Sequence, residues 1–296
     1  MRTGGKVAII AIGATLLIGG GVIFAIGLKD HKIVAETREV DLKDYDFNNF
    51  DFDIDTADVR FIVTNDSTKK VVFQENKHEN FECKVEEHTL YVTSKFSKKW
   101  YEWIVPDWTR KKVDVYLPAS DLGALKVKSS TGNLKVPHDY TFESADIHQS
   151  TGDIEYYANT SGELKIEVST GDVKMENVNV KTLTLKHSTG KAVLNTVRAE
   201  TIDINGSTGN VKLTDVITTG ELKVHGSTSD IIFDSIDGNG IDFETSTGDV
   251  KGTVLTGKMF DVKSDTGKEI YPTSTSGAPK FRVRTSTGDI KISVKA

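Results

Sequence analysis

Hydroxyl, carboxylate and histidine side chains recur at a fixed spacing in this sequence, around the tripeptide Ser-Thr-Gly and its close variants. A carboxylate or an amide follows the tripeptide in most copies, as at Asp153 and Asp172. Clustered carboxylates could hydrolyse a glycosidic bond, and repeated oxygen ligands could hold calcium. The copies begin at Ser130, Ser150, Ser169, Ser188, Ser207, Ser227, Ser246, Asp265 and Ser286.

Catalysis would need an acid or base and a charged partner that converge on one point. The position two residues before the tripeptide, whose side chain should point outward, holds Lys128, His148, Glu167, Lys186, Asn205, His225, Glu244, Lys263 and Arg284. This row is mixed and shows no convergent group. His148 and His225 are too many repeats apart to share a proton or a metal, and packing explains the inward His187 better than ligation. We therefore expect no catalytic residue, no cofactor and no small-molecule substrate.

A calcium site would need about six to eight oxygen ligands from neighbouring repeats. Asp153 and Asp172 could begin one, but Lys191 and Lys268 occupy the same position in other copies. Turn residues offer a simpler explanation, because Ser, Thr, Asp and Asn side chains bond to local amides and Gly permits a positive φ. The pattern favours a repeated backbone corner over calcium, and we expect no metal.

The segment from residue 95 to residue 112, KFSKKWYEWIVPDWTRKK, contains all three tryptophans of the chain. Aromatic and basic side chains together are typical of surfaces that contact anionic membranes or stack on sugar rings. The segment could instead be a hydrophobic cap that closes one end of a repeat array. If it is a binding loop, the candidate contact residues are Trp100, Tyr101, Trp103, Trp108, Lys98, Lys99, Arg110, Lys111 and Lys112.

A second cationic feature lies five residues after the start of the tripeptide, where lysine returns in every second repeat through most of the array. Avoidance of like charges on neighbouring strands would explain this alternation. The alternative is a stripe of cations that matches an anionic envelope polymer. The stripe consists of Lys135, Lys174, Lys212, Lys251 and Lys291. The whole chain carries a net charge of −6, so we expect no nucleic-acid partner.

The elements that position these side chains follow from the spacing of the tripeptide, which stays nearly constant from Ser130 to Ser286. Apolar residues stand three and five positions before it and four and six positions after it, with polar residues between. Alternation with a period of two predicts strands with one buried face, and a fixed period of about 20 residues is typical of a solenoid. A further apolar position follows nine residues after the tripeptide, at Val178, Val197, Val216, Ile236 and Leu255. We predict an all-β, parallel β-solenoid with about 19–20 residues per coil.

The repeat also extends upstream, since FDFDIDTADVRF places Asp55 to Asp58 at a corner between apolar positions. We therefore predict a solenoid domain over residues 45–296. Its early coils, over residues 45–128, should be irregular. The regular repeats should cover residues 129–296.

The N-terminal segment differs in composition from the rest. Val7 to Leu28 contains no charged residue and is long enough to cross a bilayer. We predict a short cytoplasmic tail over residues 1–6, a transmembrane anchor over residues 7–28 and a linker over residues 29–44. The protein would then be a single-pass cell-membrane protein with its C-terminal domain extracytoplasmic.

The N-terminal anchor, the sequence DIDTADVRF, the strand VDVYLP and the series of STGD turns together resemble the bacterial putative-adhesin family of β-strand repeats. The resemblance covers roughly residues 45–296. Membrane-anchored members of that family include proteins encoded with Lia-type cell-envelope stress systems. The resemblance implies the repeat architecture and supplies no catalytic motif.

The sequence therefore favours a non-enzymatic, membrane-anchored cell-envelope protein that binds or senses at the outer face of the membrane, in the envelope-stress response that the resemblance implies. Its partners would be the membrane and either an anionic envelope polymer or another membrane protein. Two alternatives stay open: a surface adhesin for external ligands, and a structural spacer without a specific ligand. A binder should depend on a discrete surface patch, whereas a spacer should depend on the number of coils.

Overall fold

The computed structural model describes residues 36–76, 78–96 and 110–295, and these ranges contain strands and turns but no helix. No helix able to span a membrane occurs within these ranges, and the predicted anchor at residues 7–28 lies outside them. The strands are β1 Glu36–Asp41, β2 Asn49–Thr56, β3 Asp58–Thr64, β4 Lys70–Glu75, β5 Glu79–Glu86, β6 Thr89–Phe96, β7 Lys112–Pro118, β8 Ser120–Thr131, β9 Leu134–Val136, β10 Tyr140–Thr151, β11 Ile154–Tyr156, β12 Asn159–Thr170, β13 Val173–Thr189, β14 Ala192–Thr208, β15 Val211–Thr218, β16 Glu221–Thr228, β17 Ile231–Ile236, β18 Gly240–Thr247, β19 Val250–Val254, β20 Met259–Ser264, β21 Glu269–Ile270, β22 Lys280–Thr287 and β23 Ile290–Val294.

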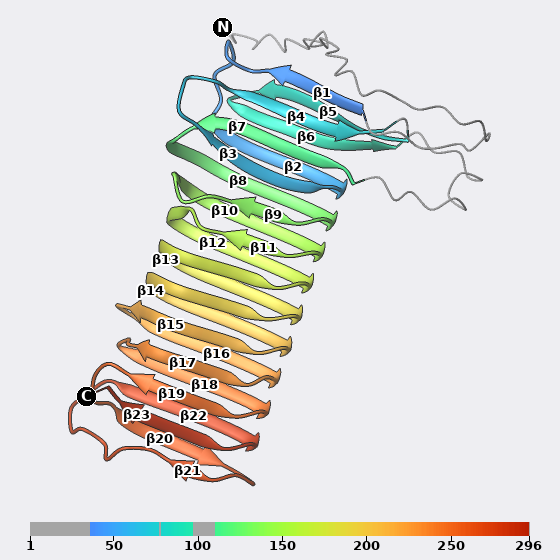
Figure 1. Cartoon of the computed structure of the whole chain (residues 1–296). Helices are drawn as coiled ribbons and strands as arrows, with labels where there is room; N and C mark the ends of the chain where they lie inside the picture. Colours follow the sequence, from blue (N-terminus) through green and yellow to red (C-terminus); the bar gives the residue numbers. More distant parts are fainter. Residues whose placement is uncertain (1–35, 77, 97–109, 296) are drawn as a thin grey trace, which may run out of the picture.

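These strands stack into a parallel β-solenoid, which confirms the fold class predicted from the repeat (Figure 1). β10 pairs in parallel with β8 on one side and with β12 on the other. β13 and β14 stay in register from Val173 opposite Ala192 to Thr189 opposite Thr208, with the same offset along their whole length. This offset equals the distance in sequence between the corners at Ser169 and Ser188. The period of the sequence is therefore the length of one coil.

The core of the solenoid is made by the inward positions predicted from the alternation. The residue three positions before each corner is fully buried in consecutive coils, as at Leu185, Ile204 and Val224. Among the positions nine residues after the corner, the prediction for Leu255 is wrong. A register shift between β17 and β19 places Val254 opposite Ile236, so Val254 is buried and Leu255 is only half-buried.

Glycine at the third corner position is required by both backbone conformation and space. The φ angle of Gly190 is +127°, and a Cβ added there would lie 2.1 Å from the carbonyl oxygen of Gly171 in the next coil. Gly132, Gly152, Gly171, Gly209, Gly248 and Gly288 also have positive φ and make the same close approach to a neighbouring corner. At these seven corners the coils therefore stack too closely to accept a side chain at this position.

The fourth corner position binds one coil to the next. Oδ1 of Asp153 accepts a hydrogen bond from the backbone N–H of Asp172 at 2.9 Å, and Oδ1 of Asp172 accepts one from Lys191 at 2.8 Å. We expected these side chains to bond to amides of their own turn, and the bonds cross to the neighbouring coil instead. Lys191 offers no acceptor and ends this run, and a second run begins at Asn210, whose Oδ1 accepts from Asp230 at 3.2 Å.

The N-terminal end of the solenoid is closed by antiparallel strands (Figure 1). β6 and β7 form a coil that pairs in parallel with β2 and β3. β4 then pairs antiparallel with β7, β1 with β4, and β5 with β6. We predicted only irregular coils for this region, but much of it is a cap, in which the rings of Phe73 and Phe81 stack at 5.4 Å.

The last two coils do not stack in the order of the sequence. β22 pairs in parallel with β18 on one side and with β20 on the other. β23 lies in the same way between β19 and β21. The C-terminal coil, residues 280–294, is therefore inserted between the coil of residues 240–254 and the coil of residues 259–270, which is outermost.

Candidate binding groove

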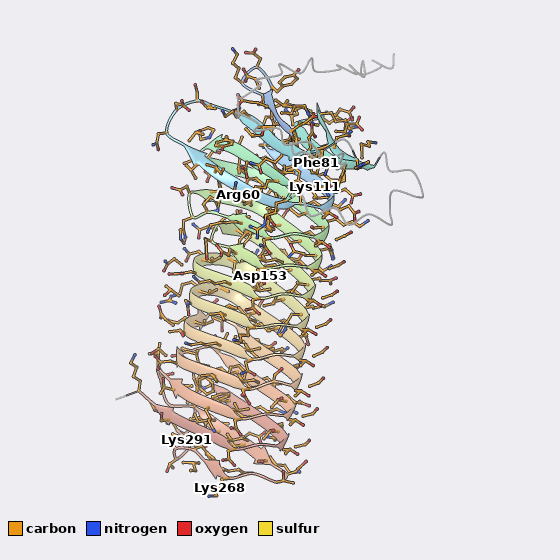
Figure 2. All side chains as sticks on the ribbon, turned by 45° about the vertical axis from the view of Figure 1, so that its right-hand side comes forward. Arg60, Phe81, Lys111, Asp153, Lys268 and Lys291 are labelled. Carbon is orange, nitrogen blue, oxygen red and sulfur yellow. The ribbon has the colours of Figure 1, made fainter. Side chains whose placement is uncertain are left out.

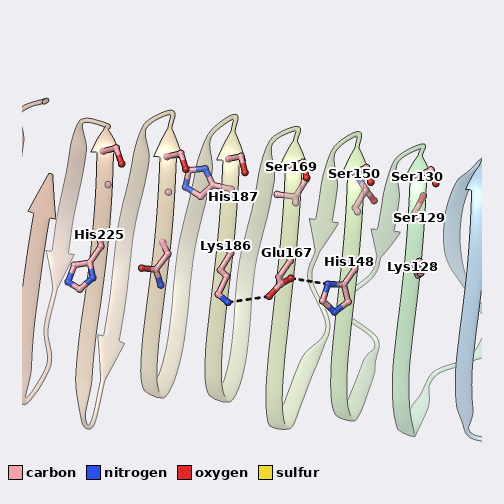
Figure 3. A pocket seen from close by; sticks show the side chains of 18 residues that line it. Lys128, Ser129, Ser130, His148, Ser150, Glu167, Ser169, Lys186, His187 and His225 are labelled. Atoms are coloured by element: carbon pink, nitrogen blue, oxygen red, sulfur yellow. Dashed lines mark ion pairs between the residues drawn. The ribbon is translucent and has the colours of Figure 1, made fainter. Parts of the chain in front are cut away.

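A groove with a volume of about 660 Å³ runs along one side of the solenoid, beside the corners (Figure 3). Three consecutive residues from each of six coils line it. We call the residues two before the corner the outer row: Lys128, His148, Glu167, Lys186, Asn205 and His225. We call the first corner residues the serine row: Ser130, Ser150, Ser169, Ser188, Ser207 and Ser227.

The two rows face the same side because they are two residues apart on a strand, and side chains alternate along a strand. The residue between them points into the solenoid, so its backbone forms the floor of the groove. Parallel pairing keeps each row in line, as His148 opposite Glu167 and Glu167 opposite Lys186 show. With about 4.8 Å between strands, the six coils place equivalent groups along roughly 24 Å.

The side chains of the serine row are all exposed, and no hydroxyl of the row has a hydrogen-bond partner within the described part of the chain. We expected these serines to bond to local amides of the turn, and they do not. Their exposure along one groove was missed from the sequence because each was treated as a corner residue. The sequence did contain a signal for the groove. In six consecutive coils the two rows are two residues apart, so their side chains point to the same side.

The outer row contains a network of charges centred on Glu167 (Figure 3). Oε2 of Glu167 lies 3.1 Å from Nδ1 of His148, and its Oε1 lies 3.3 Å from Nζ of Lys186 and 3.2 Å from Nζ of Lys165. Desolvation raises the pKa of Glu167, but the bonds from Lys165 and Lys186 outweigh it and hold that pKa below its ordinary value. The middle of the groove is therefore a balanced mixture of charges.

His148 is not placed to activate a serine of the groove. Both imidazole nitrogens of His148 face carboxylates, because Nε2 lies 2.9 Å from Oδ1 of Asp146 and Nδ1 faces Glu167. Neither nitrogen is then placed to take a proton from Ser150. Outside the groove, burial raises the pKa of the Cys83 thiol to about 12, and the described residues contain no cluster that could hold a metal ion.

Two glycines in the floor of the groove are explained by the side chains that they contact. His187 is only 3% exposed, and a Cβ on Gly206 in the next coil would lie 2.6 Å from its Nε2. Gly206 therefore makes room for the imidazole, which agrees with packing as the reason for His187. Gly226 similarly makes room for Ser229, whose Cβ would be 2.8 Å from an added Cβ, in the coil where serine replaces the corner glycine. Burial also lowers the pKa of His187.

The lysine stripe is only partly available for a ligand. Lys135 pairs with Glu155 at 2.6 Å, Lys174 with Glu176 at 3.1 Å and Lys251 with Asp249 at 2.7 Å. Lys212 has hydrophobic register partners, Val193 and Ile232. The inserted last coil places Lys291 directly beside Lys251, so the alternation predicted between these two lysines is wrong.

The candidate contact residues of the aromatic segment lie mostly outside the described residues: Trp100, Tyr101, Trp103, Trp108, Lys98 and Lys99. Arg110 is exposed and Lys112 is half-buried at the start of β7. Lys111 contradicts its assignment as a surface contact, because its side chain is 5% exposed and its Nζ lies 2.6 Å from Oε2 of Glu79. This buried ion pair fastens the chain to the cap just before β7. Figure 2 shows Lys111 at the capped end, far from Lys268 and Lys291.

The fold resembles several solved structures, all at low sequence identity. A putative adhesin from Bacteroides fragilis NCTC 9343 is 16% identical, with 89% of this chain and 98% of that one covered and a TM-score of 0.48. A putative lipid binding protein from Parabacteroides distasonis ATCC 8503 is 14% identical, with 88% and 97% covered and a TM-score of 0.44. A putative adhesin from Parabacteroides merdae ATCC 43184 is 15% identical, with 88% and 96% covered and a TM-score of 0.41.

A comparison with curated proteins gave no significant match. A family model described as Toastrack DUF4097 matches residues 47–293, which include nearly every strand of the solenoid and its cap. The chain therefore belongs to the DUF4097 family of Toastrack domains.

Proposed function

We propose that this protein is a non-enzymatic, membrane-anchored cell-envelope protein that binds an extended polymer in the groove. The observation that carries the proposal is the serine row, whose exposed hydroxyls have no partner within the described fold. Each coil places one serine hydroxyl, which can donate and accept a hydrogen bond, at the same position beside the corner. A chain-like ligand can use all six coils, whereas a compact ligand would contact only one or two.

The chemistry of the groove favours a polyhydroxylated chain, such as a cell-wall glycan. Serine hydroxyls both donate and accept hydrogen bonds, as sugar hydroxyls do. The outer row has mixed charge, since Lys186 and His148 are both paired with Glu167. A strongly anionic polymer would meet Glu167 in the middle of the groove, so it is the less suitable ligand.

The proposed anchor would hold the capped end of the solenoid near the membrane. Residues 29–35 separate the predicted anchor from β1 and span at most about 25 Å when extended. β1 belongs to the cap, and β6 and β7, which flank the aromatic segment, lie at the same end. This arrangement supports membrane contact by the aromatic segment, while the groove extends away from the cap.

The binding proposal is tested by removing hydroxyls from the middle of the groove. The triple variant Ser150→Ala, Ser169→Ala and Ser188→Ala should bind soluble cell-wall glycan strands at least tenfold more weakly than wild type, because each lost hydrogen bond contributes about 0.5–1.5 kcal/mol. The control carries Ser246→Ala and Ser286→Ala, which belong to the same corner position but lie outside the groove. Equal glycan affinity of the triple variant and wild type would refute the proposal.

A second arm separates the two polymer classes. We expect a purified polyanionic wall polymer to bind more weakly than the glycan, and its binding to fall with salt because exposed charges are screened within roughly 10 Å at 0.1 M. Binding of the polyanion alone would assign the interaction to the lysine stripe rather than to the groove. A role in envelope stress predicts that deletion of the gene lowers survival under cell-wall antibiotics.

A further inference from the structure

The outermost coil at the C-terminal end is a sheet edge, since among the described strands β20 pairs only with β22 and β21 only with β23. Its apolar side chains are less buried than those of the inner coils, with Met259 43% and Ile270 56% exposed. An exposed edge strand beside apolar side chains can template the addition of another strand. In this solenoid, the best-matched strand would come from a second copy of the chain, which has the same coil length and corner.

The edge of β20 is nevertheless occupied by groups of the same chain. The N–H groups of Met259 and Asp265 point toward the neighbouring coil. They donate to the carbonyl oxygens of Pro279 at 2.9 Å and Thr285 at 3.1 Å. Because N–H groups alternate along a strand, those of residues 260, 262 and 264 point outward. The N–H of Phe260 donates to Oγ of Ser274 at 2.9 Å, and the N–H of Ser264 donates to Oε1 of Glu269 at 2.7 Å.

A backbone group next to β20 also has a hydrogen-bond partner in the same chain. The carbonyl oxygen of Lys258 accepts a hydrogen bond from the N–H of Thr275 at 2.9 Å, so the loop of residues 271–279 lies along the start of the edge. Among the outward N–H groups of β20, only that of Val262 lacks a partner in the described residues. An added strand would therefore find one free N–H donor on β20, whereas strand pairing needs a series of them.

The corner of the outermost coil also lacks one of the bonds that join most coils. In most inner coils an Asp or Asn side chain accepts the N–H of the next corner, as Asp289 does from Lys268 at 2.9 Å. Lys268 stands at the same position in the outermost coil and has an ammonium group in place of an acceptor. A further coil would therefore lack this one bond, as the coil after Lys191 does, so Lys268 weakens the addition of a coil without preventing it.

We propose that residues 258–279 are a guard that closes the C-terminal end of the solenoid to a second copy of the chain. This proposal is independent of the ligand of the groove. It also gives a reason for the order of the last coils. The regular coil of residues 280–294 is enclosed, and the irregular coil, whose Ser274 and Glu269 block the edge of β20, is placed outside.

The test removes the two side chains that accept the outward N–H groups of β20, with Ser274→Ala and Glu269→Ala. The protein is the full chain, kept in detergent micelles. The control carries Ser276→Ala and Glu200→Ala, which are exposed residues whose side chains make no hydrogen bond within the described structure. Sedimentation velocity over a hundredfold concentration range should show a larger species for the variant with Ser274→Ala and Glu269→Ala alone. Hydrogen exchange at low concentration should show faster exchange of the Phe260 and Ser264 amides in the same variant.

Two further results decide the interpretation. Ser274→Thr with Glu269→Gln keeps a hydroxyl and a carbonyl acceptor, so it should sediment as wild type if the two side chains act through these bonds. Faster amide exchange without association would overturn the proposal, because the edge would then be open and still not add a second copy. Association without faster exchange of these two amides would also overturn it, because the new contact would lie elsewhere.

Discussion

The substitution Gly190→Ala tests how the corners of neighbouring coils stack. Its Cβ would lie 2.1 Å from the carbonyl oxygen of Gly171, whereas ordinary contacts begin at 3.4 Å, so the corner must shift by most of the difference between these distances. That shift would pull on the backbone hydrogen bonds from Gly190 to Thr208 at 3.2 Å and from Gly171 to Thr189 at 3.0 Å. The change therefore combines a steric clash with a φ of +127°, which L residues rarely adopt.

The expected cost follows from these two contributions. A non-glycine residue in a sparsely populated backbone region costs about 1–3 kcal/mol, and each weakened hydrogen bond about 0.5–1.5 kcal/mol. The free energy of unfolding should therefore fall by about 2–6 kcal/mol. Because each coil is stabilised by its neighbours, the loss should affect the cooperative unfolding of the array rather than one turn.

Two glycine controls separate the clash from the backbone strain. Gly277 has a φ of +75° with no atom within 4 Å of an added Cβ, so Gly277→Ala should cost only about 1–2 kcal/mol. Gly240 has ordinary φ and its nearest atom is Cγ of Glu221 at 3.8 Å, so Gly240→Ala should change stability by less than about 1 kcal/mol. Urea unfolding followed by circular dichroism measures all three. Equal costs for Gly190→Ala and Gly277→Ala would refute close stacking as the reason for the glycines.

Three other predictions concern the core, the groove floor and the topology. Ile204→Asp would bury an unpaired charge among fully buried apolar residues and should lower the free energy of unfolding by several kcal/mol; an unchanged melting curve would contradict the coil assignment. Burial lowers the pKa of His187, so the unfolded chain binds more protons below about pH 6.5 and stability should fall as the pH drops; His187→Gln should reduce that loss, and an identical pH dependence in both proteins would show that His187 does not cause it. Protease added to intact cells should digest the solenoid if it is extracytoplasmic, whereas protection until lysis would reverse the proposed orientation.

The coil and its core could be predicted from the sequence because both depend on local spacing. A nearly constant period and a strict alternation decide which side chains point inward, and residues such as Leu185 and Ile204 are buried as predicted. The N-terminal cap was less predictable. The strands there were recognisable, but alternation does not distinguish an antiparallel partner from a parallel one.

The order of the C-terminal coils could not be predicted from the template. The corners at Asp265 and Ser286 match it equally well in spacing, and the choice between them depends on how much apolar surface each coil buries. Phe281, Val283 and Ile290 become fully buried in the enclosed coil, whereas Met259 and Ile270 stay exposed in the outer one. Lys268 was no clear signal for the outermost coil, because Lys191 stands at the same corner position in an inner coil.

The corner motif itself separates what the fold requires from what it leaves unexplained. Close stacking requires glycine at the third position of most corners, and the bonds between coils require Asp or Asn at the fourth. The serine hydroxyl at the first position makes no hydrogen bond within the described fold, so a small residue such as alanine would satisfy the backbone equally well. If the hydroxyls only keep the corners hydrated, alanine at Ser150, Ser169 and Ser188 should have the same effect as alanine at Ser246 and Ser286. If they bind a polymer, only the substitutions inside the groove should weaken binding, while the stability of both variants stays close to that of wild type.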